Sequence, residues 1–332
     1  MNDPGVRSAE RGEQAIAKRI RAIYGKAKKE IEETIREYNL RFMEQDKEMQ
    51  ELLAAKKITK DQYDAWLKRT VFSGKAWDEK VSHCTEIMAD ANKSALKVIR
   101  GEQIGVFAEN MSFQAYELEK NVGVNLGFGI YDSSTVNNLL KKQPELLPRR
   151  VLDGVKDRAW NKNKIANEIT KSIIKGDGIG KVAESLAETL GMQNDSAMMR
   201  YARTAMTSAQ NAGRMEMLHE ADEKGVKARK KWIATLDNRT RDAHADLDGE
   251  VVEVDEYFKN SIGEIMFPGD PTADPANVYN CRCTLGYVVD GFNGRGERRA
   301  YTEDENGNRT SYTISNMTYR EWQVWKREQG RH

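Results

Sequence analysis

The sequence is poor in cysteine and contains no long apolar run. Of its three cysteines only Cys281 and Cys283 lie close together, which is not the even, spaced set of a disulfide-rich secreted protein. Nowhere do eighteen apolar residues follow one another, and the first ten residues lack the apolar core of a signal peptide. These absences favour a protein made in a reducing cytoplasm, without a membrane-spanning helix.

An excess of basic charge is also missing. The chain has 332 residues, and 53 Lys and Arg balance 52 Asp and Glu to a net charge of +1. Free-standing nucleic-acid-binding proteins are usually strongly basic, so any contact with DNA is expected to be local. The length is sufficient for two or three domains. A charged fraction of 32% suits long solvated helices.

Proline is scarce, and its positions divide the chain. Residues 5–143 and 149–267 contain no proline, which permits long helices. Apolar side chains recur every three or four residues from Ile16 to Phe42 and predict an amphipathic helix. Thr59 and Gln62 fit a capping box that starts a second helix, and a third is expected over about residues 77–99. Residues 1–148 are therefore predicted to be a helical N-terminal region.

Residues 149–230 are predicted to be helical and to lead into a smaller domain. Two short helices are expected around residues 165–173 and 182–190, separated by a glycine-rich turn at residues 176–180. This turn follows a helix and matches neither of the common phosphate-binding glycine patterns. Asp195 or Ser196 is expected to cap a longer helix that ends before Gly225.

The pattern changes at residue 231, where strand-like alternation begins. A strand is predicted over residues 231–236, then a short helix over 238–247 capped by Asp237 and ended by Gly249, then strand-like segments over 250–258 and 279–289. The predicted fold is α+β: a mostly helical N-terminal two-thirds with long amphipathic helices, then a small α+β domain with a short antiparallel sheet. We place that domain at residues 231–290 and a tail with a short helix at 291–332.

A polar cluster marks the predicted short helix. Thr240, His244 and Asp248 are spaced by four residues and would share one helix face, while Arg239 and Arg241 could reach Asp237, Asp242 or Asp246. One interpretation is a functional site centred on His244, at its most specific a metal-dependent nuclease or other hydrolase that uses nearby Asp residues. The other is a buried imidazole and a salt-bridge lattice that brace the helix.

Cys281 and Cys283 are candidate metal ligands together with His244. In a strand, residues two apart share a face, so both thiols are expected to point the same way. Structural zinc usually has four ligands, and no fourth is evident in the sequence. No cofactor is therefore expected, with zinc kept as the alternative. A buried structural pair or a catalytic dyad of cysteine and His244 are the other interpretations.

The tail contains two further candidate features. Arg295, Arg298 and Arg299 form a local basic segment that could contact phosphate, although a solvated loop is the simpler interpretation. Thr318 and Glu321 fit a capping box that leads into Trp322 and Trp325. Tryptophans three residues apart form one apolar ridge, which either docks on a partner or folds back on this chain.

Three motifs follow one another within about residues 195–290: W-x-A-x-x-D-x-R-T-R-x-x-H-x-x-L-x-G, then F-P-G-D-P and N-C-R-C-T-L. Together they resemble the phage Mu F-like minor head protein family, whose members act in head morphogenesis. Each piece alone is weak, and their order and combination are specific. The signature residues are Trp232, Asp237, Arg239, Thr240, Arg241, His244, Gly249, Pro268, Asp270, Asn280 and Arg282.

The chain departs from the family pattern at several positions. Many relatives carry Cys pairs and a His before the C-R-C, which suggests a metal knuckle. Here Arg241 and His244 stand at the Cys-x-x-Cys positions and Val278 where a His is often found, which counts against a metal. Relatives often read R-T-E in the preceding helix, whereas this chain has Ala205 after Arg203 and Thr204.

The resemblance implies a phage or prophage head morphogenesis protein with a non-catalytic role. Such a protein is present in few copies and associates with the portal protein and the head shell. It acts in head assembly or in DNA ejection, with local basic segments available to packaged DNA and no membrane contact. Its expected location is the host cytoplasm during assembly and then the interior of the virion head.

Overall fold

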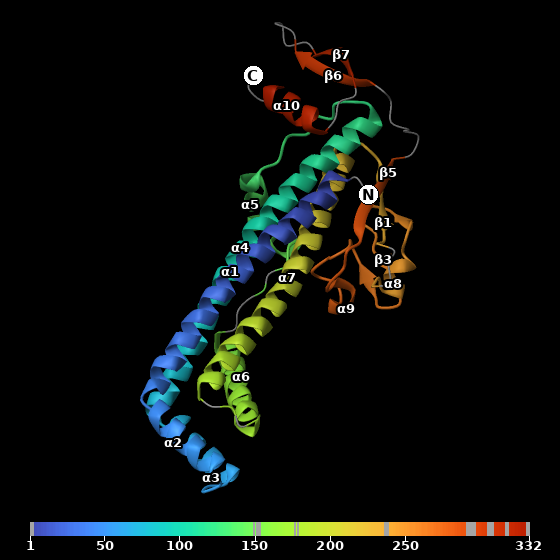
Figure 1. Cartoon of the computed structure of the whole chain (residues 1–332). Coiled ribbons are helices and arrows are strands. Elements are labelled where there is room, and N and C mark those ends of the chain that lie inside the picture. Colours follow the sequence, from blue (N-terminus) through green and yellow to red (C-terminus); the bar gives the residue numbers. More distant parts are fainter. Residues whose placement is uncertain are drawn as a thin grey trace. The chain divides into compact units, whose positions relative to one another are not determined.

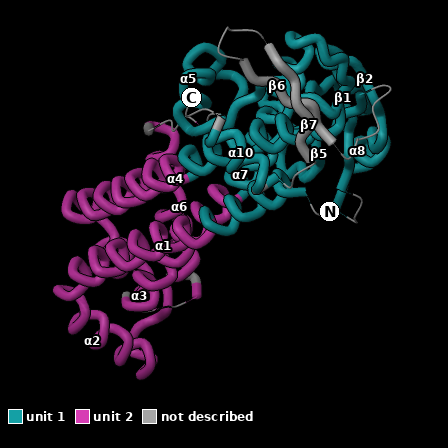
Figure 2. Tube along the Cα trace, turned by 90° about the horizontal axis from the view of Figure 1, so that it is seen from above, with its two compact units in different colours: residues 1–16, 99–149, 200–332 teal, residues 17–98, 150–199 magenta. Residues whose placement is uncertain are grey.

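The computed structural model describes residues 3–148, 150, 154–175, 177, 179–235, 239–289, 297–303, 309–315 and 319–329. Long helices are followed by short strands, which confirms the predicted α+β class (Figure 1). The chain forms two compact units, and each combines segments that are distant in sequence (Figure 2). Unit 1 comprises residues 1–16, 99–149 and 200–332, and unit 2 comprises residues 17–98 and 150–199.

Unit 2 is helical, and its core contains the apolar stripe predicted from the sequence. Ile20, Ile31 and Ile35 of the first helix are completely buried. The capping box is confirmed, because Thr59 Oγ1 accepts from the Gln62 N–H and Gln62 Oε1 accepts from the Thr59 N–H. The helices that contribute to this unit are α1 (Pro4–Leu40), α2 (Met43–Ala54), α3 (Lys60–Trp66), the π-helical η1 (Leu67–Val71), α4 (Lys75–Val122), α6 (Gly154–Lys175) and α7 (Ile179–Glu223).

A chain of buried polar side chains connects four helices of unit 2. Tyr24 of α1 donates to Asn92 of α4 over 2.5 Å, Asn92 donates to Asn194 of α7 over 3.2 Å, and Asn194 donates to Asn161 of α6 over 3.3 Å. Buried polar groups are costly unless they are paired. These hydrogen bonds therefore favour one register of the four helices.

Two predicted helices are shorter than the observed ones. The prediction that a helix starts at Asp195 is wrong, because α7 runs without interruption from Ile179 to Glu223. Apolar side chains such as Leu190 and Met198 stay buried on both sides of the capping signal, so packing overrides it. Similarly, α4 continues from the predicted end near Ile99 to Val122. The break between α6 and α7 falls where the glycine-rich turn was predicted.

Every strand among the described residues lies in unit 1, where the main sheet has the antiparallel order β2-β1-β5. Trp232 pairs with Leu285 in this sheet, and both side chains are buried. The elements beyond α7 are β1 (Ala228–Ile233), α8 (Asp242–Ala245), β2 (Val251–Val252), β3 (Phe258–Lys259), β4 (Glu264–Ile265), α9 (Pro275–Val278), β5 (Thr284–Val289), β6 (Glu297–Glu303), β7 (Arg309–Ser315) and α10 (Tyr319–Gln329); α5 (Ser133–Lys142) and η2 (Pro144–Leu146) precede α6.

The short antiparallel sheet is confirmed, but two strands are shorter than predicted. The strand expected over residues 279–289 begins only at Thr284, and the one expected over residues 250–258 reduces to β2 and the start of β3. Cys281 and Cys283 therefore precede β5 instead of lying in it. The reason is tertiary, because their backbone carbonyls accept hydrogen bonds from α7 side chains, not from a neighbouring strand.

Within unit 1, α7 passes very close to α4. A Cβ atom placed on Gly213 of α7 would lie 2.5 Å from the Phe107 carbonyl oxygen and 3.3 Å from the Met111 nitrogen. Only glycine permits this approach of the two backbones. The helix ends two residues before Gly225, which has φ +82°, as the sequence predicted. None of the described helices is both long enough and apolar enough to cross a membrane.

Candidate functional site

The signature segments of unit 1 converge on one face of α7. That face carries Thr204, Thr207, Asn211 and Arg214, spaced by three, four and three residues, and all but Thr207 are almost fully buried. Thr204 Oγ1 accepts from the Asn280 N–H over 3.2 Å, and Thr207 Oγ1 donates to the Cys281 carbonyl over 2.8 Å. This polar row was not predicted from the sequence, although its helical spacing was visible.

Asn211 joins two of the three signature motifs. Its Nδ2 donates to the Pro268 carbonyl over 2.8 Å and to the Cys283 carbonyl over 3.1 Å, while its Oδ1 accepts from the Leu285 N–H over 2.8 Å. The F-P-G-D-P and N-C-R-C-T-L segments therefore share one completely buried amide. Arg214 continues the row by donating to the Leu285 carbonyl over 3.2 Å.

The F-P-G-D-P segment folds as a tight loop against α7. Asp270 is buried and accepts hydrogen bonds from the N–H groups of Met266 and Thr272 over 3.1 and 2.8 Å. Gly269 has φ +85°, and a Cβ atom there would lie 3.0 Å from the Ser208 nitrogen. The loop therefore requires glycine for both its conformation and its closeness to the helix.

The Arg and Thr residues of the first motif brace the site through backbone carbonyls. Arg241 donates to the Tyr279 carbonyl, and Thr240 donates to the Thr235 carbonyl. Thr235 in turn donates to the carbonyl of Arg282 over 2.7 Å. These three hydrogen bonds brace the site through carbonyl acceptors, whereas the sequence predicted that Arg239 and Arg241 pair with Asp carboxylates.

Other signature residues occupy turns. Gly249 has φ +83° and donates its N–H to the Trp232 carbonyl over 2.9 Å. Asn280 has φ +56°, a conformation that asparagine tolerates better than most residues. Arg239 is exposed in the turn before α8. Asp237, the predicted helix cap, lies outside the described residues.

The predicted helix face of Thr240, His244 and Asp248 does not form. Helix α8 spans only Asp242–Ala245, so a spacing of four residues does not align these side chains. His244 points into the interior, whereas Asp248 is exposed and accepts from the Ala234 N–H over 2.8 Å. Asp242 and Asp246 are exposed as well. The acidic residues named for a hydrolase are therefore not gathered around the imidazole.

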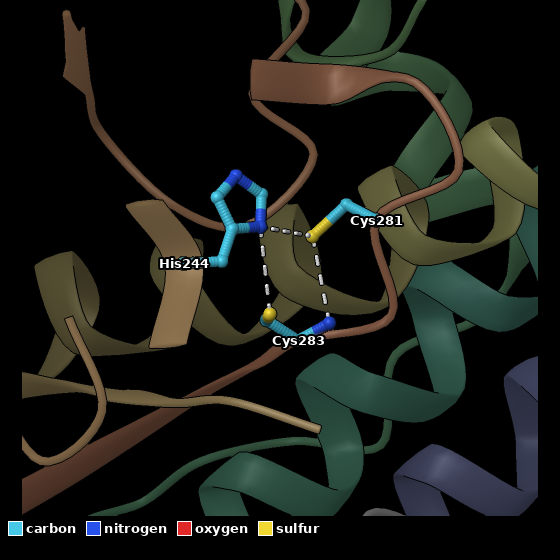
Figure 3. Close-up of side chains that lie close together, drawn as sticks. All are labelled: His244, Cys281 and Cys283. Carbon is cyan, nitrogen blue, oxygen red and sulfur yellow. Dashed lines mark hydrogen bonds between the residues drawn. The ribbon is translucent and has the colours of Figure 1, made fainter. Parts of the chain in front are cut away.

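His244, Cys281 and Cys283 form a compact buried cluster (Figure 3). Nδ1 of His244 lies 3.6 Å from Sγ of Cys281 and 3.6 Å from Sγ of Cys283. All three side chains point toward one another, from α8 and from the segment between α9 and β5. The residues are 1%, 2% and 2% exposed. The cluster offers one nitrogen and two sulfur ligands, but a substrate for a Cys–His dyad would have little access to it.

The two thiols titrate as a pair. The hydrogen bond from Cys281 lowers the pKa of Cys283 to about 5. The hydrogen bond with Cys283, together with burial, raises the pKa of Cys281 well above its ordinary value. The pair therefore loses its first proton easily and its second with difficulty, because two thiolates in contact repel each other.

The other ring nitrogen of His244 contacts the amide of Asn277, which is itself hydrogen-bonded to Asn260. Nε2 lies 3.3 Å from Oδ1 of Asn277, and the same oxygen accepts from Nδ2 of Asn260 over 3.1 Å. Trp232 and His244 also make an edge-to-face ring contact with centroids 5.3 Å apart. Asn277 and Asn260 were not predicted, because a buried amide gives no sequence signal of its partner.

The two candidate docking residues of the tail have different surroundings. Trp322 is completely buried, where its ring lies 5.9 Å from that of Tyr116. This is the folded-back arrangement, so Trp322 is not exposed for docking. Trp325 is only partly buried, and its docking role remains a prediction. Arg295 and Thr318 lie outside the described residues, as do the side chains of Arg298 and Arg299.

Comparisons with known proteins agree with the signature. The family model described as phage Mu protein F like protein matches residues 163–286. The minor head protein GP7 of Bacillus phage SPP1 is 31% identical over 236 residues, which cover 71% of this chain and 74% of that protein. No solved structure matches this chain.

Two other relatives match over shorter stretches. The NAD(+)--arginine ADP-ribosyltransferase EFV of Enterococcus faecalis is 35% identical over 138 residues, which cover 40% of this chain and only 27% of that protein. The uncharacterized protein YqbB of Bacillus subtilis is 30% identical over 161 residues, which cover 44% of this chain and 51% of that protein. From the family match and the extent of similarity to the phage protein, we conclude that the chain belongs to the phage Mu F-like minor head protein family.

Proposed function

We propose that this chain is a non-catalytic minor head protein that acts in phage head morphogenesis and associates with the portal. The observation that carries the proposal is the similarity to the SPP1 minor head protein, which extends over 71% of this chain and 74% of that protein. Similarity confined to the signature segments would leave the long helices unexplained. Here it reaches well beyond them.

The geometry of the signature segments supports a structural role. The polar side chains of Asp270 and Arg241 in these segments, and that of Asn211 in the adjoining helix α7, are hydrogen-bonded to backbone N–H and carbonyl groups. The candidate nucleophiles Cys281 and Cys283 are buried. A catalytic centre needs groups that a substrate can reach. A structural role for the signature segments, as an internal brace of a binding protein, is therefore better supported than a catalytic one.

The portal interaction can be tested with the full-length chain. We would co-express it, carrying a cleavable affinity tag, with the portal protein of the same phage or prophage, and measure co-purification and sedimentation. A portal subassembly carrying this chain is expected. The matched control replaces this chain by an equally tagged phage protein of the tail. If neither the portal nor assembled head shells retain the chain above that control, the proposed association is wrong.

Location and DNA contact require separate measurements. Mass spectrometry of purified virions is expected to find this chain in few copies in the head, and its absence from virions would contradict the assignment. Binding of DNA, followed by fluorescence anisotropy, is expected to be weak and to decrease with salt, because phosphate contacts release counterions. Incubation of the chain with DNA and Mg²⁺ or Zn²⁺ is expected to leave the DNA intact.

A further inference from the structure

The His244, Cys281 and Cys283 cluster has the dimensions of a zinc site. Zinc binds sulfur at about 2.3 Å and imidazole nitrogen at about 2.0–2.1 Å with tetrahedral angles, which places the nitrogen about 3.6 Å from each sulfur. Both observed distances from Nδ1 to Sγ are 3.6 Å. Nδ1 is therefore already separated from each sulfur by the edge length of a coordination tetrahedron, and all three ligand atoms lie within 4.8 Å of one another.

The surrounding amides orient the imidazole for metal binding. Asn260 Oδ1 accepts from the N–H groups of Ile262 and Gly263 over 2.9 and 3.2 Å, which fixes its Nδ2 as the end that donates to Asn277 Oδ1. That oxygen therefore faces Nε2 of His244 as an acceptor, so Nε2 must carry the ring proton.

A proton on Nε2 leaves Nδ1 of His244 unprotonated in the neutral ring. In a neutral imidazole with its proton on Nε2, Nδ1 has a free lone pair, and in this structure Nδ1 faces the two sulfurs. Ligand histidines in metal sites usually donate their second ring N–H to an oxygen acceptor in this way. Asn260 and Asn277, which lie outside the cluster, thus orient His244 so that its Nδ1 can bind a metal.

The backbone and the charge balance fit a metal as well. The Cys283 N–H donates to Sγ of Cys281 over 3.4 Å, a contact that stabilises a thiolate. Two thiolates and one Zn²⁺ together carry no net charge, so the filled site avoids most of the cost of burying an ion. Two sulfurs and an imidazole nitrogen are also the ligand types that suit zinc.

We propose that the chain binds one zinc ion through Nδ1 of His244 and Sγ of Cys281 and Cys283. The ion joins α8 to the segment before β5 and acts as a cross-brace, because its ligands are nearly inaccessible. Asn277 is a positioning residue that acts through His244. The proposal does not depend on the role of the chain in head assembly.

The first test measures metal content in the full-length chain. Protein purified under reducing conditions, with its affinity tag removed, is expected to contain about one zinc per chain by inductively coupled plasma mass spectrometry. After chelation, Co²⁺ is expected to restore a tetrahedral visible spectrum with sulfur-to-metal charge-transfer bands. If reduced, folded protein neither contains zinc nor takes up Zn²⁺ or Co²⁺, the proposal is overturned. A Cys281–Cys283 disulfide, detected by mass spectrometry, would overturn it too.

Variants assign the ligands. Cys283→Ser and His244→Leu are expected to lose the stoichiometric metal, whereas Cys84→Ser, which removes a buried cysteine of unit 2, is expected to keep it. Retention of zinc by Cys283→Ser, or its loss from Cys84→Ser, would contradict the assignment. If a ligand variant does not fold, X-ray absorption of the zinc-loaded wild type decides, since two sulfur neighbours and one imidazole are expected.

The positioning role of Asn277 has its own readout. Asn277→Leu removes the acceptor for the Nε2 proton and is expected to weaken zinc binding 10- to 100-fold while leaving the stoichiometry at saturation unchanged. Asn277→Asp keeps an acceptor there and is expected to restore most of the affinity. If Asn277→Leu lowers thermal stability and leaves zinc affinity unchanged, the residue is merely structural.

Discussion

Trp322 of α10 donates its indole N–H to the carboxylate of Glu119 of α4 over 2.8 Å, although the two residues are 203 positions apart. The same carboxylate accepts from Lys326 over 2.9 Å and from the Leu126 N–H over 3.0 Å. Glu119 and Trp322 are both completely buried. One buried acid therefore holds the tail helix and the loop after α4 in unit 1.

Replacing Glu119 by Gln is expected to release α10. The amide presents N–H groups to donors and leaves the Lys326 ammonium, whose side chain is only 7% exposed, without its counter-charge. Breaking a buried pair on one side costs about 3–5 kcal/mol. Limited proteolysis should then cleave within residues 319–329 sooner than in the wild type. Glu109→Gln, which removes a surface pair with Arg11, should cleave at the wild-type rate; equal cleavage of all three proteins would contradict the prediction.

Asn211→Asp is expected to be strongly destabilising in spite of its similar size. A carboxylate cannot donate to the carbonyls of Pro268 and Cys283, which would leave both acceptors unsatisfied at about 1–3 kcal/mol each. Urea unfolding followed by circular dichroism measures the loss. Asn167→Asp on the exposed face of α6 is the matched control and should change stability little. Similar unfolding midpoints for the two variants would show that Asn211 does not hold the signature segments together.

Two helical glycines are expected to respond in opposite directions to alanine. Gly213→Ala forces a Cβ atom against the Phe107 carbonyl and should destabilise the chain by about 1–3 kcal/mol. Gly105→Ala in α4 meets no atom within 4 Å and should stabilise it by about 0.5–1 kcal/mol, because alanine loses less conformational freedom on folding. Thermal unfolding compares the two, and a stabilising Gly213→Ala would mean that α4 and α7 do not pack this closely.

Lys230 is expected to make the stability of the chain vary with pH in the alkaline range. Burial lowers its pKa to about 8, below the ordinary value of a lysine, although its Nζ donates to the Met266 carbonyl over 3.0 Å. Between pH 8 and the unfolded pKa the unfolded chain binds more protons than the folded one, so this residue's contribution to stability rises with pH. At neutral pH the buried charge costs free energy.

The test compares the wild type with Lys230→Met at pH 7.5 and at pH 10 by urea unfolding. Other titrating groups are common to both proteins and cancel in the difference. The free energy of unfolding of the wild type, relative to that of Lys230→Met, is expected to increase as the pH rises. The increase is up to about 3 kcal/mol over the full interval between the folded and unfolded pKa values of Lys230. A difference that is constant with pH, or one that moves in the opposite direction, would show that the ammonium is solvated in the folded chain.

Periodic and local features were predicted well from the sequence. The apolar stripe of α1, the Thr59 capping box and the helix end before Gly225 were found as predicted, because each depends on neighbours a few residues away. The false helix start at Asp195 shows the limit of local signals. A capping residue competes with the packing of the whole apolar stripe, and in α7 the packing is stronger.

Part of the candidate site was likewise predicted from the sequence, and part of it was found only in the structure. His244, Cys281 and Cys283 were named together from their residue types, but on the premise that both cysteines lie in a strand. Both thiols do face Nδ1 of His244, yet the backbone there is held by Thr207 and Asn211 of α7 instead of by a neighbouring strand. Asn277 and Asn260, which orient the imidazole, could not be predicted, because their local sequence does not distinguish them from the other asparagines of this chain.

The sequence by itself determined the fold class, the family and the three candidate residues His244, Cys281 and Cys283, because these depend on composition, periodicity and motif order. Only the tertiary structure decided that the cluster is buried, that Nδ1 faces the sulfurs and that Trp322 folds back onto Glu119. Contacts between residues tens or hundreds of positions apart depend on the packing of α4 and α7 within unit 1, and no local pattern encodes them.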